Sequence, residues 1–396
     1  MPSDSDFKNR HSGEKRKLLF IVSEDWYFTS HRLPLAIAAK ESGYDVVIAT
    51  RISNQRDIME AHDLGVIPLE HMKRSSINII NEFKSILEIA KIIRAQSPTI
   101  VHAVAIKPVI YAALSRWIFN VPLIVAALGG LGTIFIDDGL KSRLFKPIVK
   151  TLFRLLLNGP NSKVILQNKN DVAVLTQMCG LQADNVVLIP GAGVDIEHYP
   201  KKPILNDPPV VMLASRMIWP KGIQEFVDAA IMVKKKRMVR FVLVGRQDSE
   251  NPLSVPEELL QKWNQDGVVE WWGHQTNMAD VLSQATLVCL PTYYGEGMPK
   301  ILLEAMSMGR PIITTDTPGC RELVADGLTG VCVGKRNALS LSDAIDMLLS
   351  HPEQLPVMGS NARLMVETKY GVKGVIDQTL QLYSLSLPLG ELRHIG

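Results

Sequence analysis

The chain has 396 residues, 46% of them hydrophobic, and a formal net charge of +3 at pH 7. This length exceeds one ordinary hydrophobic core and suits two α/β domains, and the apolar content excludes global disorder. The small net charge argues against nucleic acid as a partner, because nucleic-acid-binding proteins present a strongly basic face.

The cysteine and hydropathy patterns predict a cytoplasmic protein. The four cysteines form no CxxC pair and no metal-binding spacing, so we expect reduced thiols and no metal site. Residues 1–16 are polar and charged, which predicts a disordered tail rather than a signal peptide. No apolar run reaches the ~18 residues of a membrane span, so the protein is expected to be soluble or peripheral.

The first half alternates apolar runs with amphipathic stretches. Strands are predicted at 17–23, 45–50, 66–70, 99–105, 122–128 and 162–168, with helices between them, for example at 78–95. Apolar strands of this length between helices are typical of a parallel sheet covered on both faces. We therefore predict a first Rossmann-like domain over residues 17–200.

The second half repeats the pattern. Strands are predicted at 209–215, 240–245, 268–273, 286–292, 311–316 and 329–334, which gives a second Rossmann-like domain over 201–371. Residues 198–209 are rich in proline and lysine, as expected of an interdomain linker. Two doubly wound α/β domains that face each other place a ligand site between their carboxyl strand ends.

Two cations follow the strand at 209–215, in the sequence SRMIWPKG. Arg216 and Lys221 would project from the strand end toward the cleft. A guanidinium binds oxygens in a planar fork and an ammonium acts as a point charge, so the pair suits a diphosphate. The alternative interpretation is that Arg216 and Lys221 are two solvated surface cations around a turn.

The stretch Glu296–Glu304 predicts a second part of this site. Pro299 fits the first turn of a helix, and Gly297 beside Met298 lets the backbone approach a ligand closely. The free N–H groups of a helix start favour phosphate or sugar oxygens. Glu304 is then a candidate to bind ribose hydroxyls, and Glu296 is a candidate to bind the sugar. The alternative for Glu304 is a carboxylate on the helix face that pairs with a neighbouring residue.

Weaker candidates follow other strands. Gly245 and Arg246 follow the strand at 240–245, and His274 follows the strand at 268–273, where they would flank a nucleobase. A turn farther along the chain carries Arg321 and Glu322. These two residues could line the cleft, but a structural ion pair is at least as good an interpretation.

The first half has its own candidates at strand ends. His31 belongs to a segment after the first strand that we expect to be a tight loop, where an acceptor or phosphate would approach. His102 and Lys107 accompany the strand at 99–105, and Gly130 lies in a glycine-rich turn after 122–128. His102 is proposed to assist catalysis, although a histidine in an apolar strand is more often a core residue.

These segments resemble a known family. SRMIWPKG followed by EGMPKILLEAMSMGRPIITTDTPGCRELVADGLTGVCV resembles the donor domain of glycosyltransferase family 4, including its E-x7-E motif. DWYFTSHRLPLA, HAVAIKPVIYAAL, VAALGGLG and LQNKND are similar to a branch that extends lipid-diphosphate-linked sugars in polysaccharide, O-antigen or glycan assembly. The resemblance covers residues 17 to about 387.

The resemblance implies a GT-B fold, a UDP-hexose or UDP-N-acetylhexosamine donor, retention of anomeric configuration, and no metal or other cofactor. It assigns the donor diphosphate to Arg216 and Lys221, the ribose to Glu304, and the transferred sugar to Glu296. It also implies that a final helix within 372–396 crosses back to the first domain. One departure is the segment at 24–26, Glu-Asp-Trp, where many members have a Gly-Gly loop.

Residues 140–157 predict a helix with a cationic stripe, Lys146, Lys150 and Arg154, beside Leu152, Phe153 and other apolar residues. A helix with this pattern could lie on an anionic membrane surface. The same pattern equally fits an ordinary helix that covers a sheet and keeps its charges in water.

Other functions remain possible on the same architecture. They are a nucleotide-sugar epimerase, a phosphorylase, and a non-catalytic relative that binds UDP-sugar. A nicotinamide-dependent oxidoreductase is disfavoured, because the turn after the first strand, SEDWYFTSHR, contains no glycine.

Overall fold

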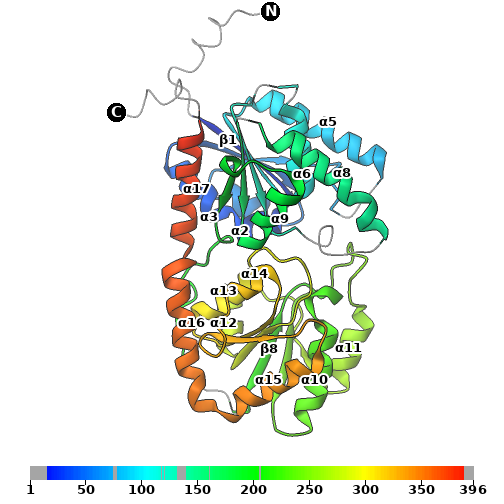
Figure 1. Cartoon of the computed structure of the whole chain (residues 1–396), viewed down its shortest axis with the longest axis vertical. Helices are drawn as coiled ribbons and strands as arrows, with labels where there is room; N and C mark the ends of the chain where they lie inside the picture. Colours follow the sequence, from blue (N-terminus) through cyan, green and yellow to red (C-terminus); the bar gives the residue numbers. More distant parts are fainter. Residues whose placement is uncertain are drawn as a thin grey trace, which may run out of the picture.

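The computed structural model describes residues 16–74, 78–116, 118–119, 121–131, 140–159, 161–204 and 207–387. These residues form two domains, one above the other in Figure 1, and each is built on a single parallel sheet. This confirms the predicted α/β class with two Rossmann-like domains. The predicted tail at 1–16 lies almost wholly outside the described residues.

The first sheet has seven parallel strands in the order β3-β2-β1-β4-β5-β6-β7. Their bounds are β1 (Lys17–Glu24), β2 (Asp45–Arg51), β3 (Gly65–Pro68), β4 (Ile100–Val104), β5 (Leu123–Leu128), β6 (Ser162–Leu166) and β7 (Val186–Leu188). The sequence predicted all of them except β7. That edge strand has only three residues, Val-Val-Leu, none of them buried, so its apolar run is shorter than the roughly four to eight residues that predict a strand.

Helices cover both faces of this sheet. One face carries α5 (Ile79–Gln96), α6 (Ile106–Arg116), α8 (Leu140–Leu157) and α9 (Lys169–Cys179). The other carries α2 (Asp25–His31), α3 (Leu33–Glu41), α4 (Arg56–Glu60) and α17 (Val372–Ser386), whose apolar residues join a second core cluster.

The second sheet has six parallel strands in the order β10-β9-β8-β11-β12-β13. The strands are β8 (Val210–Ala214), β9 (Arg240–Val244), β10 (Glu270–Trp271), β11 (Leu287–Leu290), β12 (Ile312–Thr315) and β13 (Gly330–Val333). The helices are α10 (Ile223–Lys234), α11 (Glu257–Gln265), α12 (Met278–Ser283), α13 (Lys300–Ser307), α14 (Pro318–Arg321), α15 (Ala338–Ser350) and α16 (Leu355–Lys369). Three short 3-10 helices, η1 (Ala183–Asn185), η2 (Trp219–Lys221) and η3 (Pro352–Gln354), complete the described elements.

The chain returns to the first domain at its end. The Val372 N–H donates to the Val194 carbonyl at 2.9 Å, and α17 then runs along the first domain, in red in Figure 1. Tyr383 of α17 is fully buried within the first-domain core. Burial of one face of α17 therefore ties the last helix to the first domain.

One segment, after β1, differs from the sequence prediction. Where we expected a tight loop after β1, residues 25–31 form helix α2, because the buried Asp25 carboxylate accepts the Trp26 N–H at 2.7 Å and the Ser53 N–H at 2.7 Å. A carboxylate in the first turn satisfies an N–H group that has no partner within the helix.

The helix at 140–157 uses much of its apolar face for the core. Phe153 is fully buried against the sheet, while Ile148 and Leu155 are exposed. Leu152 packs against the same core. Among the described residues, no helix combines the length and the apolar character needed to cross a bilayer.

Candidate active site

The candidate site lies where the carboxyl ends of the two sheets meet. The segments that follow β5 and β6 in the first domain contact the segment that follows β11 in the second. Parallel strands place their carboxyl ends at one edge of a sheet, so strand-end residues that are distant in sequence converge there. The two domains thus bring together several of the residues that the sequence singled out.

Arg216 follows β8 and is held by a carboxylate. Its Nη1 donates to Asp248 Oδ2 at 2.7 Å, and the Arg216 side chain is one-third exposed. Arg74, from the first domain, donates to both oxygens of the same carboxylate at 2.5 Å. Burial alone would raise the Asp248 pKa, but the two guanidinium groups outweigh it and lower that pKa. Two cations from opposite domains therefore converge on one oxyanion.

Lys221 ends η2 and forms a mostly buried ion pair with Glu296. The Thr292 hydroxyl donates to the same Glu296 carboxylate at 3.1 Å. The Lys221 ammonium also lies 5.7 Å from the centre of the Tyr294 ring. The structure thus brings together the lysine of the first motif and the first glutamate of the second.

Tyr294 joins these two ion-pair groups. Burial raises the Tyr294 pKa, and the charges that act on this tyrosine next are those of Arg216 and Glu296. The Arg216 group and the Lys221 group therefore both lie near Tyr294. An arginine and a lysine near one residue are a suitable pair for a diphosphate.

Helix α13 begins at Lys300, directly after Pro299 as its N-cap residue. The Glu304 carboxylate is 7% exposed and pairs with the Lys300 ammonium one turn earlier, at 2.9 Å. Burial, followed by the Glu304 charge, raises the pKa of the Tyr199 phenol. A buried carboxylate with a cation and a phenol beside it is a strong hydrogen-bond acceptor for a hydroxyl.

Glycines allow the two domains to touch. Gly130 has φ +109°, and a Cβ added there would lie 2.5 Å from both Gly295 O and Gly297 N. The Met298 N–H donates to Gln167 Oε1 at 2.9 Å across the same interface. The predicted glycine turn after β5 therefore contacts the backbone at Glu296, just before α13.

The predicted nucleobase residues share one sheet edge. Gly245 has φ +138°, and its N–H donates to the Gly273 carbonyl at 2.7 Å, next to the exposed His274. The Met217 N–H donates to the Arg246 carbonyl at 3.1 Å, so the exposed Arg246 adjoins the Arg216 segment. The three residues therefore lie beside the donor cations.

His31 lies at the end of α2, facing the second domain. Burial, with the positive charges of Lys300 and Arg32, lowers the His31 pKa to about 3, so the imidazole is neutral at pH 7. The ring stacks on Tyr27 with 4.2 Å between centroids. Because the charges of Lys300 and Lys221 act on His31, this histidine of the first domain lies near the cations of the second.

The structure corrects the interpretation of His102 as a catalytic residue. His102 is fully buried in β4, and its Nδ1 lies 2.5 Å from the Tyr383 hydroxyl of α17. Burial lowers the His102 pKa, which keeps the ring neutral. A side chain enclosed by the sheet and α17 does not reach a substrate, so His102 is a core residue.

Lys107, at the start of α6, contacts α5 and the residue next to Arg74. Its ammonium pairs with Glu82 of α5 at 2.8 Å and donates to the Lys73 carbonyl at 3.0 Å. These contacts connect α6 to α5.

Arg321 and Glu322 have separate partners. Arg321 pairs with the exposed Asp316, whereas the Glu322 carboxylate accepts the Lys169 N–H at 2.9 Å across the domain interface.

Sequence reasoning missed four contributors: Arg74, Asp248, Tyr294 and Gln167. Arg74 stands in a loop that carries no periodic or glycine signal, and Asp248 lies three residues after Gly245, but only the fold brings the two to Arg216. Gln167 belongs to LQNKND, a segment already noted in the resemblance, and Tyr294 immediately precedes the Glu296 motif.

Comparison with known proteins agrees with this site. The family model described as "Glycosyl transferase 4-like" matches residues 17–168, and the one described as "Glycosyl transferases group 1" matches residues 208–351. The first match spans β1 to β6, and the second contains Arg216, Lys221, Glu296 and Glu304.

Curated relatives cover nearly the whole chain. The N,N'-diacetylbacillosaminyl-diphospho-undecaprenol alpha-1,3-N-acetylgalactosaminyltransferase of Campylobacter jejuni is 26% identical over 89% of this chain and 94% of its own length. The UDP-Gal:alpha-D-GlcNAc-diphosphoundecaprenol alpha-1,3-galactosyltransferase of Escherichia coli is 22% identical over 78% of this chain and 81% of its own.

Solved structures share the fold. Anabaena Alr3699/HepE in complex with UDP and glucose is 18% identical, with a TM-score of 0.76 over 93% of this chain and 100% of its own. The sucrose-phosphate synthase of Thermosynechococcus elongatus is 21% identical, with a TM-score of 0.77 over 93% of this chain and 98% of its own. With glycosyltransferase models matching both domains, the chain belongs to glycosyltransferase family 4 and has the GT-B fold.

Proposed function

We propose that this glycosyltransferase moves a hexose or N-acetylhexosamine from a UDP-sugar to a lipid-diphosphate-linked sugar, with retention and without a metal ion. The observation that carries the proposal is the convergence of Arg216 and Lys221 around Tyr294, beside the start of α13. The printed activities of the Campylobacter and Escherichia relatives support the acceptor class.

The cations would exchange partners when the donor binds. Arg216 is held by Asp248 and Lys221 by Glu296, so each is oriented before a phosphate arrives. As the leaving diphosphate gains charge, the guanidinium, the ammonium and the N–H groups of α13 stabilise it. Glu304 then accepts the ribose hydroxyls.

Transfer proceeds by attack on the face from which the diphosphate leaves. The bond between the anomeric carbon and the phosphate oxygen breaks, and its electron pair stays on that oxygen. The acceptor hydroxyl oxygen bonds to the anomeric carbon on the same face, and its proton passes to the departing phosphate oxygen. This path needs no covalent nucleophile on the protein, in keeping with the absence of a convincing one among the candidate residues.

Membrane association belongs to the same proposal. A lipid-linked acceptor is confined to a bilayer, so we place the enzyme peripherally at the cytoplasmic face of the membrane. The helix at 140–157 would contribute Lys150 and Arg154, with Ile148 and Leu155 exposed beside them. Lys150→Glu with Arg154→Glu tests this contribution by vesicle sedimentation.

A donor and acceptor screen tests the function. UDP- and GDP-sugars are incubated with lipid-diphosphate-sugar acceptors, with and without EDTA, and the anomeric configuration of the product is read by NMR. We expect one UDP-sugar to be transferred with retention in the presence of EDTA. An inverted product, an EDTA-sensitive reaction, or an epimerised donor without acceptor would each contradict part of the proposal.

A further inference from the structure

Helix α2 carries aromatic side chains that the reaction derived above does not use. Trp26, Tyr27 and His31 are partly exposed. By contrast, Phe28 is fully buried and packs edge-on against Phe20 of β1, with 5.5 Å between the ring centroids. Because the buried ring holds α2 on the sheet, the partly exposed rings are fixed in position before any ligand arrives. Aromatic side chains of this kind are typical of ligand-binding clefts.

The three partly exposed rings, which we call the aromatic row, contact one another in sequence. The Tyr27 and His31 rings lie one helical turn apart and stack, with 4.2 Å between centroids and 8° between planes. Trp26 meets Tyr27 edge-on, with 6.1 Å between centroids and 79° between planes. Since the His31 imidazole is neutral at pH 7, the aromatic row is an uncharged surface of the first domain.

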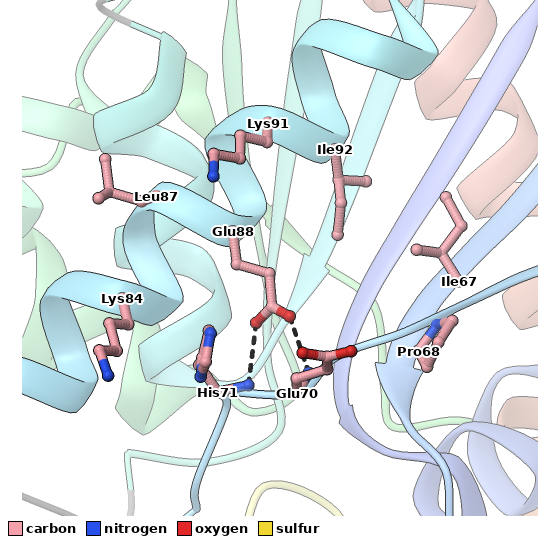
Figure 2. Close-up of a pocket in the computed structure, with 9 residues that line it drawn as sticks. All are labelled: Ile67, Pro68, Glu70, His71, Lys84, Leu87, Glu88, Lys91 and Ile92. Carbon is pink, nitrogen blue, oxygen red and sulfur yellow. Dashed lines mark hydrogen bonds between the residues drawn. The ribbon is translucent and has the colours of Figure 1, made fainter.

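The Trp26 end of the aromatic row lies beside a cation that reaches the donor site. The Arg74 guanidinium carbon is 5.9 Å from the centre of the Trp26 ring, and the same side chain donates to a carboxylate of the second domain. The segment that leads to Arg74 is anchored on α5, because the Glu88 carboxylate accepts the Glu70 N–H at 2.8 Å and the His71 N–H at 3.1 Å (Figure 2). The Trp26 end is therefore fixed at the domain interface.

The His31 end of the aromatic row lies near other cations of the donor motifs. The charges of Lys300 and Lys221 act on His31. A Cβ added at Gly129 would lie 3.1 Å from the Tyr27 hydroxyl oxygen, so the middle of the row adjoins the glycine turn that contacts the second domain. Both ends and the middle of the aromatic row thus lie at the domain interface, close to the residues assigned to the donor.

Polar groups stand at the edges of these rings. Within the part of the chain that the structure describes, neither the Trp26 indole N–H nor the Tyr27 hydroxyl has a hydrogen-bond partner, and neither is buried. His31 Nδ1 lies 2.6 Å from the Ser30 hydroxyl, which engages one of its two ring nitrogens. Rings with accessible polar edges match a ligand that has an apolar face and hydroxyl groups around its rim. A pyranose ring is such a ligand.

We propose that the aromatic row binds the pyranose ring of the acceptor sugar. C–H groups on one face of the sugar lie against the rings, while sugar hydroxyls bond to the indole N–H, the phenol and the imidazole. The donor-binding residues of the two motifs belong to the second domain, so the acceptor approaches from the side of the first. The inference rests on the proposed transfer reaction and adds the surface that recognises the acceptor.

Binding of soluble methyl glycosides by the full chain tests this surface without donor, lipid or turnover, so that its failure is separate from failure of the transferase proposal. The probes are the methyl α-glycosides of glucose, galactose, N-acetylglucosamine and N-acetylgalactosamine, titrated by NMR. We expect saturable binding of at least one. Trp26→Leu should weaken that binding by at least about tenfold, and Trp26→Phe, which keeps a ring, should restore most of it.

A matched control is Phe83→Leu, which removes a ring that is 60% exposed on α5 of the same domain. It should bind the glycoside as the unchanged chain does. Trp26→Leu should keep its affinity for UDP and, in transfer assays, its KM for the UDP-sugar, while its KM for the acceptor rises at least about tenfold. These arms separate an acceptor sugar from the donor sugar and from a stacked nucleobase.

Three results would overturn the proposal. They are the absence of saturable binding for all four glycosides, equal binding in Trp26→Leu and the unchanged chain, and a loss of UDP or donor affinity as large as the loss of glycoside affinity. If Trp26→Leu does not fold, Tyr27→Phe decides the question, because it keeps the ring and removes only the hydroxyl. It should weaken glycoside binding about threefold or more, and unchanged binding would contradict the proposal.

Discussion

At the scale of single residues, the site depends on ion pairs that hold cations ready for a phosphate. Lys221 and Glu296 pair within the second domain, while Asp248 connects Arg216 to Arg74 of the first. Each carboxylate holds its cation where a phosphate oxygen would contact it. The cations are therefore already oriented, which lowers the free-energy cost of arranging them when a diphosphate binds.

Lys221→Ala should lower kcat/KM for transfer by on the order of a hundredfold or more, because one cation that stabilises the leaving group is lost. Circular dichroism should show an intact fold. Lys262→Ala, which removes an exposed cation of α11 far from the motifs, is the matched control and should keep full activity. Near-normal turnover by Lys221→Ala would count heavily against the site.

Glu304→Leu should remove recognition of the ribose, because leucine has a similar size but no hydrogen-bonding group. A hydrogen bond to a charged acceptor contributes about 1.5–3 kcal/mol, so the unchanged enzyme should bind UDP at least about tenfold tighter than 2',3'-dideoxy-UDP. The variant should bind the two nucleotides equally in calorimetric titrations. If the variant and the unchanged enzyme discriminate between the two nucleotides to the same extent, Glu304 does not hold the ribose and only forms the ion pair with Lys300.

At the scale of elements, hydrophobic periodicity predicted twelve strands because most of them, such as β1, β4, β5, β8 and β11, are buried apolar runs flanked by turns. It failed at α2, where the helix depends on the buried Asp25 carboxylate and its contacts to residues 53–55. For His102 it left two roles open, that of a core residue and that of a catalytic residue. Long-range partners such as Tyr383 decide between them.

Helix α9 offers a pH test at this scale. Burial raises the pKa of Asp171 in its first turn to about 6, above the value of about 3.9 in an unfolded chain. Between these values the folded state binds more protons, so stability falls as pH rises from about 4 to 6, by about 2–3 kcal/mol. Asp171→Asn should remove this contribution.

The measurement is urea unfolding of both proteins at the two ends of that pH range. The difference in unfolding free energy between Asp171→Asn and the unchanged chain should shift in favour of the variant as pH rises. A difference that is independent of pH would show that Asp171 does not titrate in this range.

At the scale of the whole molecule, the domain interface is held by contacts that cross it. Arg51 donates to both Glu250 oxygens at 2.9 and 3.0 Å, and Gln167 accepts from the Met298 backbone. Site residues such as Arg74 and Asp248 meet only when the domains close, which is why the sequence could not pair them. Closure therefore assembles the site.

Gly130→Val should hold the domains apart, because its side chain would collide with the backbone of Gly295 and Gly297. We expect a larger radius of gyration in X-ray scattering and a large loss of activity. Gly267→Val is the matched control, since Gly267 also has positive φ but nothing within 4 Å of an added Cβ. Equal scattering curves for the two variants would contradict the role of Gly130 in closure.

The most direct test of the central claim is an experimental structure of the full chain with bound UDP. The account predicts diphosphate oxygens within hydrogen-bonding distance, about 2.7–3.2 Å, of Arg216 and Lys221, and ribose hydroxyls on Glu304. Nucleotide bound outside the domain interface, or a diphosphate that neither cation contacts, would contradict it.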